Sequence, residues 1–311
     1  MTQKKITQLL LTLLLFLSFS LSIAFGQSEK DAYRVEIFTS SDAPELDIST
    51  TGGSISVFGH DQNEVKVVMY VRRGGSYLQP SDHDLSDFEI DISQTGNRIT
   101  ASAKRESGIT GFFRGTPISI SFEVYAPAGS SVEGSTSGGS LLVENIHNNI
   151  NMRTSGGSVT AKDLSGNIAL RTSGGNISLE NLNGIISART SGGTLNINKV
   201  FGTAELSTSG GSIRISESGG KLSARTSGGS IRADFVEFSD DIELRTSGGN
   251  INITLPSTDH FNLELSGFRV DTELRNFSGR SERNSISGRI GNGGPLLAAR
   301  TSGGSVSLVY Q

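Results

Sequence analysis

The chain contains no cysteine and no tryptophan, and only 6 of its 311 residues are proline. The absence of cysteine excludes disulfide bonds, thiolate metal sites and a lipid-modified N-terminal cysteine. Aromatic residues make up 6% and hydrophobic residues 34% of the sequence, which is little for a globule with a thick core. We therefore expect a thin structure with much surface, held together by its own packing alone.

The chain also lacks an excess of charge of one sign. Its 27 Lys and Arg residues and its 31 Asp and Glu residues are interspersed and give a net charge of −4 at pH 7. A protein that binds nucleic acid concentrates basic residues on one surface. The charge pattern therefore argues against nucleic acid as a partner.

Long apolar runs are absent after the N-terminal segment. Apart from Gln8, residues 6–25 are apolar or small; they follow two lysines and lead into Ala24 and Gly26 at the positions that a signal peptidase requires. We expect a signal peptide at residues 1–26, cleaved after Gly26, that exports the chain to the periplasm, the cell envelope or the extracellular space. Because about 20 apolar residues also span a bilayer, an uncleaved N-terminal anchor is the alternative. After cleavage no integral membrane span is expected.

Glycine is abundant, with 39 residues, and many of them lie in one repeated tetrapeptide. Thr-Ser-Gly-Gly occurs eight times, and the first six copies follow one another with a constant 18-residue period. A fixed short period of this kind indicates a stack of similar structural units. The copies begin at Thr136, Thr154, Thr172, Thr190, Thr208, Thr226, Thr246 and Thr301.

Each 18-residue unit is predicted to form two short strands separated by two glycine corners. Apolar and polar residues alternate within each strand, as expected for a strand with one buried side. Glycine supplies the positive φ that tight corners need. A unit of this length is too short for two helices and their loops. We therefore predict an all-β fold: a single-domain parallel β-solenoid of the β-helix or β-roll type, with about two strands per coil and Gly-Gly corners.

The apolar positions align in columns when the units are stacked at their period. One column runs from Leu141 to Ile231, and another runs from Ile150 to Ile242. These columns are predicted to be interior ladders with neighbours about 4.8 Å apart. The repeat threonine has the inward parity. We expect its hydroxyl to bind either a backbone group of the corner or the threonine of the adjacent coil.

Residues 27–311 are predicted to be one β-solenoid domain. Within it, residues 27–135 form divergent N-terminal strands and a cap, residues 136–255 form the regular 18-residue repeats, and residues 256–311 form irregular C-terminal coils. Atypical ends are expected, because the terminal coils must cover the core and the exposed strand edge.

Several segments resemble a known bacterial family. They are residues 46–57, LDISTTGGSISV; the Thr-Ser-Gly-Gly-(Ser/Asn)-Ile ladder; the Leu-Ser-Gly-Asn-Ile half-repeats; and residues 286–294, ISGRIGNGG. Over residues 33–311 the chain is similar to the putative adhesin family, a domain of unknown function whose members are exported or envelope proteins with a β-solenoid core. The resemblance implies this fold and this location. Its motifs are structural and imply no catalytic residue.

No constellation of residues indicates catalysis or a cofactor. The four histidines lack the spacing of metal ligands, and no glycine-rich loop fits a phosphate cradle. Acidic residues at Asp82, Asp84 and Asp87, and at Asp240 and Asp241, are interpreted as solvated loop residues. We therefore assign no catalytic, cofactor-binding or metal-binding residue and expect no cofactor. A polysaccharide-active enzyme on a β-helix, with paired carboxylates in a cleft, is the less favoured alternative.

One outward column is rich in arginine, because an arginine precedes the repeat threonine in most copies. Such a stack suits an anionic polysaccharide or another anionic envelope component. The favoured alternative is that the arginines cover this face and pair with acids such as Glu205 and Glu243. The residues of this possible anionic-ligand edge are Arg153, Arg171, Arg189, Arg225 and Arg245, with Arg300 in the same position of the last copy.

These features favour an exported, non-catalytic cell-envelope or surface-interaction protein of the adhesin type. The alternative is a passive structural element of the envelope. A surface-interaction protein should bind through one face, and its expected partner is an anionic glycan or an envelope component.

Overall fold

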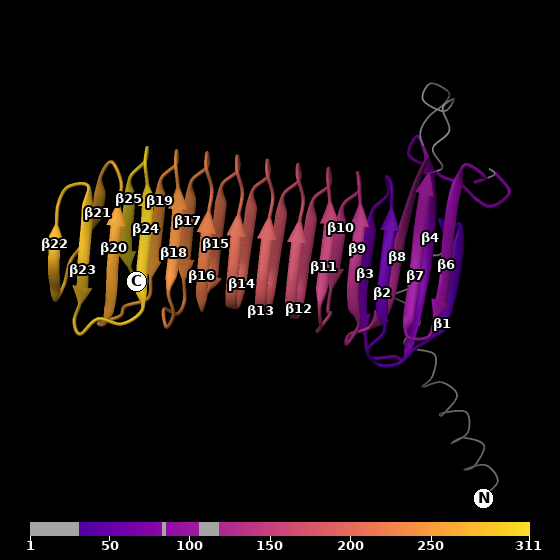
Figure 1. Cartoon of the computed structure of the whole chain (residues 1–311), viewed down its shortest axis with the longest axis horizontal. Helices are drawn as coiled ribbons and strands as arrows, with labels where there is room; N and C mark the ends of the chain where they lie inside the picture. The colour runs from indigo at the N-terminus through magenta and orange to yellow at the C-terminus, as the bar shows by residue number, and fades with distance from the viewer. Residues whose placement is uncertain (1–30, 83–84, 106–117) are drawn as a thin grey trace, which may run out of the picture.

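The computed structural model describes residues 31–82, 85–105 and 118–311, and the expected signal segment at residues 1–26 lies outside them. The described residues form 25 strands in one continuous hydrogen-bonded system and contain no α-helix. The strands stack side by side into a long rod (Figure 1). The predicted all-β solenoid is therefore confirmed.

The rod has two long faces, named here face A and face B, and the chain alternates between them as it winds. β12 (Val159–Arg171), β13 (Ile177–Arg189) and β14 (Leu195–Ser207) each bend around a corner and contribute to both faces. Along the rod, the other strands of face A are β1 (Arg34–Thr39), β4 (Glu64–Arg73), β8 (Ile118–Pro127), β3 (Ile55–His60), β10 (Leu141–Glu144), β15 (Ile213–Ser218), β17 (Ile231–Phe235), β19 (Ile251–Leu255), β25 (Val306–Tyr310) and β21 (Val270–Thr272). Those of face B are β6 (Phe88–Thr95), β7 (Arg98–Arg105), β2 (Glu45–Thr50), β9 (Ser131–Thr136), β11 (Ile150–Thr154), β16 (Lys221–Arg225), β18 (Ile242–Thr246), β24 (Leu296–Thr301), β20 (Phe261–Ser266), β23 (Ser285–Ile290) and β22 (Phe277–Ser281). The short β5 (Ser76–Tyr77) forms a hairpin with β4.

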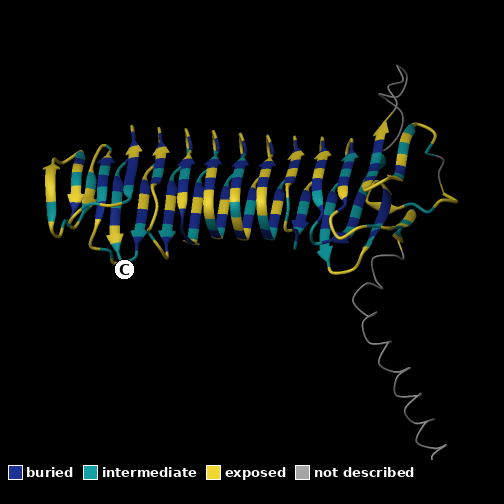
Figure 2. Cartoon of the chain, turned by 60° about the horizontal axis from the view of Figure 1, so that its bottom comes forward, coloured by how far each residue is buried: buried dark blue, intermediate teal, exposed yellow. Residues whose placement is uncertain are grey.

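The core is a thin apolar layer between the two faces. Buried and more exposed residues alternate along most strands (Figure 2). Ile177 on face A is 0% exposed and pairs in parallel register with Leu195 one coil away. Ile186 on face B is 1% exposed and pairs with Ala204. The predicted interior columns are confirmed. They contain Leu141, Val159, Ile177, Leu195, Ile213 and Ile231 on face A, and Ile150, Ile168, Ile186, Ala204, Leu222 and Ile242 on face B.

The repeat threonines form a second, polar ladder inside the Thr-Ser-Gly-Gly corner. The hydroxyl of Thr190 donates a hydrogen bond to the carbonyl oxygen of Gly175 in the preceding coil, at 2.8 Å, and accepts one from the amide of Gly193, at 3.2 Å. All eight repeat threonines make this pair of contacts, and all are only 2–7% exposed. Of the two partners expected for the hydroxyl, the structure therefore shows the corner backbone rather than the neighbouring threonine.

The second glycine of the tetrapeptide is required for close contact between coils. A Cβ atom on Gly193 would lie 2.0 Å from the carbonyl oxygen of Gly175, and the equivalent distance is 1.9–2.2 Å in all eight copies. The first glycine has more room, since a Cβ on Gly192 would lie 3.6 Å from its nearest neighbour. None of these glycines has a left-handed φ. The expectation that positive φ explains the Gly-Gly corner is wrong, because the short distance between coils is the constraint.

Left-handed backbone occurs instead at the opposite corner, where the chain passes from face A to face B. Gly184 has a φ of +135° there, and the residue three positions earlier, Asn181, has a φ of +57°. The left-handed region is costly for most residues other than glycine, and asparagine and aspartate tolerate it best. Left-handed residues recur at this corner in Asn145, Asp163, Asn181, Lys199 and Glu217, and left-handed glycines in Gly166, Gly184, Gly202 and Gly220.

The order of the coils along the rod differs from their order in the sequence at both ends. The last coil, β24–β25, pairs with β18–β19 on one side and with β20–β21 on the other. As a result, the Thr301 hydroxyl donates to the carbonyl oxygen of Gly249, at 2.7 Å, although the two residues lie 52 positions apart in the sequence. The coil β2–β3 is inserted in the same way between β7–β8 and β9–β10. Each of these coils is therefore held by neighbours on both sides.

Antiparallel strands end the parallel stack on both faces at the N-terminal end and on face B at the C-terminal end. At the N-terminal end, β4 and β1 follow β8 on face A and β6 follows β7 on face B, all in antiparallel register. At the C-terminal end, β23 and β22 follow β20 on face B in the same manner. The edge strand of a stack exposes unpaired backbone groups that other chains can pair with, and these terminal strands cover the edge of the regular parallel coils.

The glycine contact leads to a matched pair of variants. Gly193→Ala is expected to lower the free energy of unfolding by about 3 kcal/mol, because its methyl group would overlap a backbone carbonyl that the stack holds in place. Gly192→Ala is expected to change it by less than about 1 kcal/mol. Denaturant unfolding followed by circular dichroism measures both, and equal losses would contradict the proposed role of the second glycine.

The threonine ladder leads to a second test. Thr190→Val keeps the shape of the side chain but leaves the Gly175 carbonyl and the Gly193 amide without their partner, so we expect a loss of about 1–3 kcal/mol. Thr190→Ser retains the hydroxyl and should lose clearly less. Thermal unfolding of the two variants beside the parent chain measures the difference, and a valine variant as stable as the serine variant would rule out a structural role for the hydroxyl.

Candidate functional site

The outer surface of face B carries three rows of side chains that run along the rod. The parallel register places equivalent residues of successive coils beside one another, about 4.8 Å apart. The outer row contains Arg98, Glu45, Ser131, Asn149, Asn167 and Ile185; the middle row contains Asp47, Glu133, Asn151, Ala169, Ser187, Glu205 and Glu243; and the arginine row contains Ser49, Ser135, Arg153, Arg171, Arg189, Ser207, Arg225, Arg245 and Arg300.

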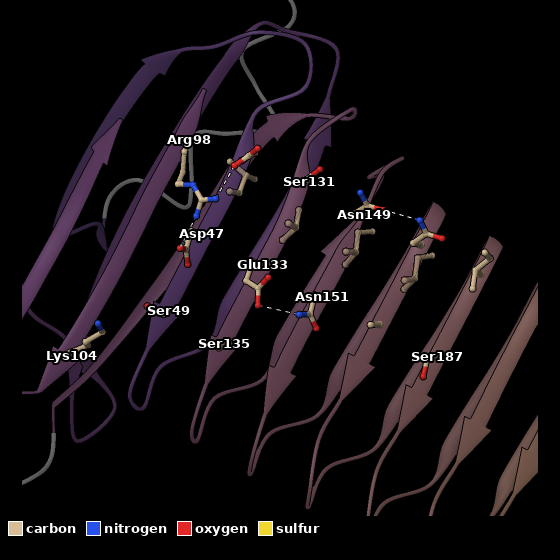
Figure 3. Close-up of a pocket in the computed structure, with 18 residues that line it drawn as sticks. Asp47, Ser49, Arg98, Lys104, Ser131, Glu133, Ser135, Asn149, Asn151 and Ser187 are labelled. Atoms are coloured by element: carbon tan, nitrogen blue, oxygen red, sulfur yellow. Dashed lines mark hydrogen bonds and ion pairs between the residues drawn. The ribbon is translucent and has the colours of Figure 1, made fainter. Parts of the chain in front are cut away.

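A groove of about 920 Å³ crosses these rows in the N-terminal half of the rod (Figure 3). It extends from β7 and β2, across β9 and β11, to β12 and β13, and therefore runs along the rod and across the strands. Its lining combines apolar side chains, among them Ile150, Ile168 and Ile185, with amides, hydroxyls, carboxylates and two cationic side chains. The labelled lining residues are Asp47, Ser49, Arg98, Lys104, Ser131, Glu133, Ser135, Asn149, Asn151 and Ser187.

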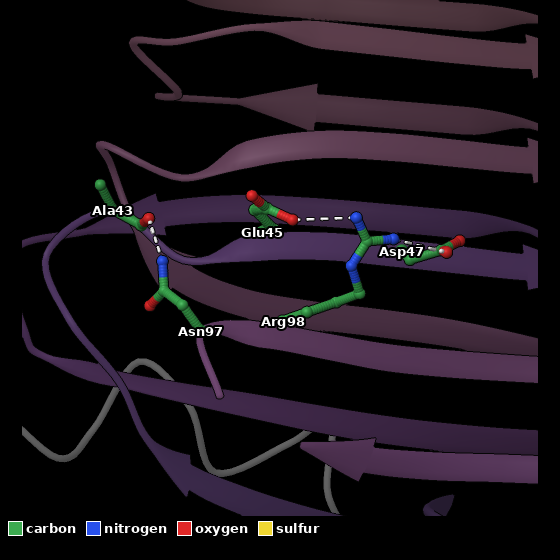
Figure 4. A network of polar contacts seen from close by, with 5 residues as sticks. All are labelled: Ala43, Glu45, Asp47, Asn97 and Arg98. Carbon is green, nitrogen blue, oxygen red and sulfur yellow. Dashed lines mark hydrogen bonds and ion pairs between the residues drawn. The ribbon is translucent and has the colours of Figure 1, made fainter. Parts of the chain in front are cut away.

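Ion pairs close the groove at its N-terminal end. The guanidinium of Arg98 lies 2.9 Å from the Glu45 carboxylate and 3.5 Å from the Asp47 carboxylate (Figure 4). The neighbouring Asn97 donates from its side-chain amide to the carbonyl oxygen of Ala43 at 2.9 Å. These contacts fix the β6–β7 turn against the start of β2. The two carboxylates are thereby occupied, although such exposed pairs contribute little stability.

Amide side chains form the central part of the groove. Asn151 donates to the carboxylate of Glu133 at 3.1 Å, and Asn167 donates to the side-chain oxygen of Asn149 at 3.0 Å. Each of these contacts joins adjacent coils. An amide has two donor hydrogens and two acceptor lone pairs, so one such bond leaves further capacity for a ligand. The groove therefore presents an ordered series of donors and acceptors.

The arginine row is divided into paired and unpaired residues. Arg189 pairs with Glu205, both Arg225 and Arg245 pair with Glu243, and Arg300 pairs with Glu264. Within the described part of the chain, neither Arg153 nor Arg171 forms an ion pair. The pairing expected from the sequence thus holds for the C-terminal part of the row, and the two arginines beside the groove stay available.

Burial raises the pKa of the Glu243 carboxyl, but hydrogen bonds and charge from Arg225 and Arg245 outweigh burial and leave the pKa below its ordinary value. The two guanidinium groups thus favour the ionised form of this carboxylate. Because Arg225 and Arg245 already bind Glu243, they are less available to an anionic ligand than their position in the arginine row suggested.

The acidic and histidine residues considered from the sequence are dispersed. Asp82 accepts a hydrogen bond from the amide of Gln79, and Asp241 accepts one from the amide of Leu296. His60 and His260 accept hydrogen bonds from nearby backbone amides. In residues 31–82, 85–105 and 118–311 no three His, Cys, Asp or Glu side chains come together as metal ligands. Asp84 lies outside the described residues.

Sequence reasoning did not identify the groove. Asn149, Asn151 and Asn167 occupy outward positions of the repeat, and their polarity alone does not distinguish them from other surface residues. The signal that would have found them is their recurrence at the period of the repeat: Asn149 and Asn167 occupy the same position of successive coils. Arg98, Glu45 and Asp47 line the groove because the coil β2–β3 is inserted between two other coils, and no local pattern in the sequence indicates this.

Over the described residues, no helix has the length and apolar character needed to cross a bilayer.

Comparison with known proteins identifies the fold. The family described as Toastrack DUF4097 matches residues 14–309. The chain is similar to a putative adhesin from Parabacteroides distasonis ATCC 8503, at 13% identity over 89% of this chain and 96% of that chain, with a TM-score of 0.50. It is also similar to a putative adhesin from Bacteroides fragilis NCTC 9343, at 12% identity over 89% and 96% of the two chains and a TM-score of 0.39. The chain is similar as well to a putative lipid binding protein from Parabacteroides distasonis ATCC 8503, at 15% identity over 89% of this chain and 96% of that chain, with a TM-score of 0.43. At these identities the likeness concerns the fold alone. No curated protein matches the chain.

The lowered pKa of Glu243 leads to a test of the paired part of the row. A carboxyl with a lowered folded-state pKa stabilises the fold above its unfolded pKa, about 4.3 for glutamate, and this stabilisation is lost as the pH falls through the folded-state value. Glu243→Gln is therefore expected to lower stability by about 0.5–1 kcal/mol at pH 7 and to match the parent chain in strong acid. Glu180→Gln is the control, because Glu180 forms no ion pair in the described structure. Unfolding curves at several pH values measure both, and a pH-independent difference for Glu243→Gln would contradict this account.

Proposed function

The chain belongs to the Toastrack DUF4097 family, and from that premise and from the groove on face B we propose that it is an exported, non-catalytic surface-interaction protein that binds an extended polar polymer along its rod. The signal segment predicted at residues 1–26 supports export. The adhesin name of the Parabacteroides distasonis structure is of the same functional class. The ligand we propose is a glycan of the envelope or of an opposing surface.

The observation that carries this proposal is the direction and composition of the groove. Its volume of about 920 Å³ is spread across six strands, β7 to β13, rather than gathered into one deep cavity. A small solute needs a concave pocket that covers most of its surface. A shallow groove that crosses six strands suits an extended chain, because successive units of that chain can each contact a different coil.

The stacked coils also hold the groove in place before a ligand arrives. Asn151 and Asn167 lie on strands whose backbone is paired on both sides, and their side chains already bond across coils. Binding therefore orders few additional groups, which lowers its entropic cost. A rigid surface of this kind supports recognition of a polymer that is itself extended.

The carboxylates of the groove support binding rather than hydrolysis. Glycoside hydrolysis requires one carboxyl group as acid and a second as base or nucleophile on opposite sides of the bond. Here Glu45 and Asp47 share the Arg98 guanidinium, and Glu133 accepts from Asn151. The three groups line one side of an open surface and are engaged by protein partners.

Binding of glycans by the mature chain, residues 27–311, tests this proposal. We expect retention of one or more extended polysaccharides on a glycan array. Asn151→Ala together with Asn167→Ala is expected to weaken binding about tenfold, since each lost hydrogen bond is worth about 0.5–1.5 kcal/mol. Asn196→Ala is the matched control, because Asn196 is an exposed outward asparagine on face A. If no polysaccharide is retained, or if the control weakens binding equally, the groove is not the binding site and a passive structural role is favoured.

A further inference from the structure

We propose that the polymer is acidic and that Arg153 and Arg171 bind its carboxylate groups. This inference rests on the proposed function, and it adds the charge of the ligand and the residues that select it. The ligand class is an acidic polysaccharide whose carboxylates recur along an extended chain.

The first support is a pattern within the arginine row itself. When an arginine of this row forms an ion pair with a glutamate of the next coil, that glutamate is the middle-row residue of the coil. Arg189 pairs with Glu205 in this way. The same relation joins Arg225 to Glu243 and Arg300 to Glu264. The fold therefore contains a repeated position in which a carboxylate is bound by an arginine.

At the two coils beside the groove this carboxylate is missing. The position that corresponds to Glu205 is occupied by Ala169 for Arg153 and by Ser187 for Arg171. Both are small side chains. A cleft of about 150 Å³ lies at this place, and its lining includes Arg153, Ala169, Arg171 and Ser187. The cleft thus occupies the place where the other coils carry a glutamate.

The charges around the cleft favour an anion. Arg153 lies directly opposite Arg171, and Arg171 lies directly opposite Arg189. Like charges directly opposite each other on neighbouring strands are destabilising. Arg189 is compensated by Glu205, whereas the other two have no acidic partner within the described structure. A bound anion would relieve this repulsion and would add charge-assisted hydrogen bonds to the guanidinium groups.

The cleft is continuous with the groove. Asn151, Ala169 and Ser187 line both of them. A polymer that lies in the groove therefore passes the two unpaired arginines, which are separated by one coil, about 4.8 Å. This geometry suits acidic groups carried by successive units of one chain. The proposed ligand is held by amides along its length and by guanidinium groups at its carboxylates.

The first experiment compares an acidic polymer with its neutral form. The probes are polygalacturonate, which carries a carboxylate on each unit, and the same polymer with its carboxylates methyl-esterified. We expect the mature parent chain to bind the acid at least tenfold more tightly than the ester at low ionic strength. This preference should fall as salt is added, because salt screens exposed charges.

Two double variants then separate charge from shape. Ala169→Glu with Ser187→Glu should pair with Arg153 and Arg171 as Glu205 pairs with Arg189, and should remove the preference for the acid. Ala169→Gln with Ser187→Gln adds nearly the same bulk without charge and should retain it. Equal loss in both variants would show that bulk alone blocks the site and would overturn the assignment of the arginines.

A second pair of variants tests the arginines directly. Arg153→Gln with Arg171→Gln should abolish the preference for the acid. Arg225→Gln with Arg245→Gln should keep it, because both of these arginines already form ion pairs with Glu243. Thermal unfolding confirms that each variant is folded. Loss of the preference in the Arg225 and Arg245 variant alone would overturn the proposal.

The outcomes also distinguish this inference from the proposed function. Equal binding of acid and ester by the parent chain would overturn the acidic preference and leave polymer binding in place. Binding of neither probe, nor of any polysaccharide on the array, would overturn both. Tighter binding to vesicles that contain anionic lipid than to polygalacturonate would overturn the choice of a polysaccharide as the ligand.

Discussion

The structure depends on the close approach of one coil to the next at the Thr-Ser-Gly-Gly corner. The second glycine leaves room for a carbonyl oxygen that a methyl group would overlap, as for Gly193 over Gly175 at 2.0 Å. The threonine hydroxyl bridges the same two coils by donating to that carbonyl and accepting from the next amide. Because this contact is repeated in all eight Thr-Ser-Gly-Gly corners, it fixes the spacing and the register of both faces together along the regular part of the rod. An apolar core alone would leave the register less well determined.

A fixed register has consequences for the outer surface. Since equivalent residues stand directly beside one another, a substitution in one coil changes the surroundings of its neighbours in a predictable way. A glutamate at position 205 neutralises Arg189, whereas an alanine at position 169 leaves Arg153 unpaired. The arginine row thus has one stretch in which arginines form ion pairs with glutamates and one stretch in which they do not. The groove adjoins the uncompensated stretch, and this combination is the basis of the functional proposals.

The ends of the rod show how a repeat protein limits its exposed edges. The coils β2–β3 and β24–β25 are each inserted between two others, so that neither is left as the outermost layer. Antiparallel strands then complete the ends. The inserted coil at the N-terminal end also brings Asp47 and Glu45 beside Arg98 and thereby forms one end of the groove. The architecture of the cap and the shape of the candidate site have a common origin.

The sequence by itself determined the regular part of the rod. The constant period of the tetrapeptide, the alternation around Ile177 and Ile186, and the inward threonine are local features that repeat, so stacking them has one consistent solution. The arginine row followed from the same period. Tertiary structure alone decided the contacts between segments that are distant in sequence: Thr301 on Gly249, β2 between β7 and β9, and therefore the groove. Those contacts depend on the paths of the loops and on which of several similar coils pair with one another, and the repeats in the sequence do not specify that pairing.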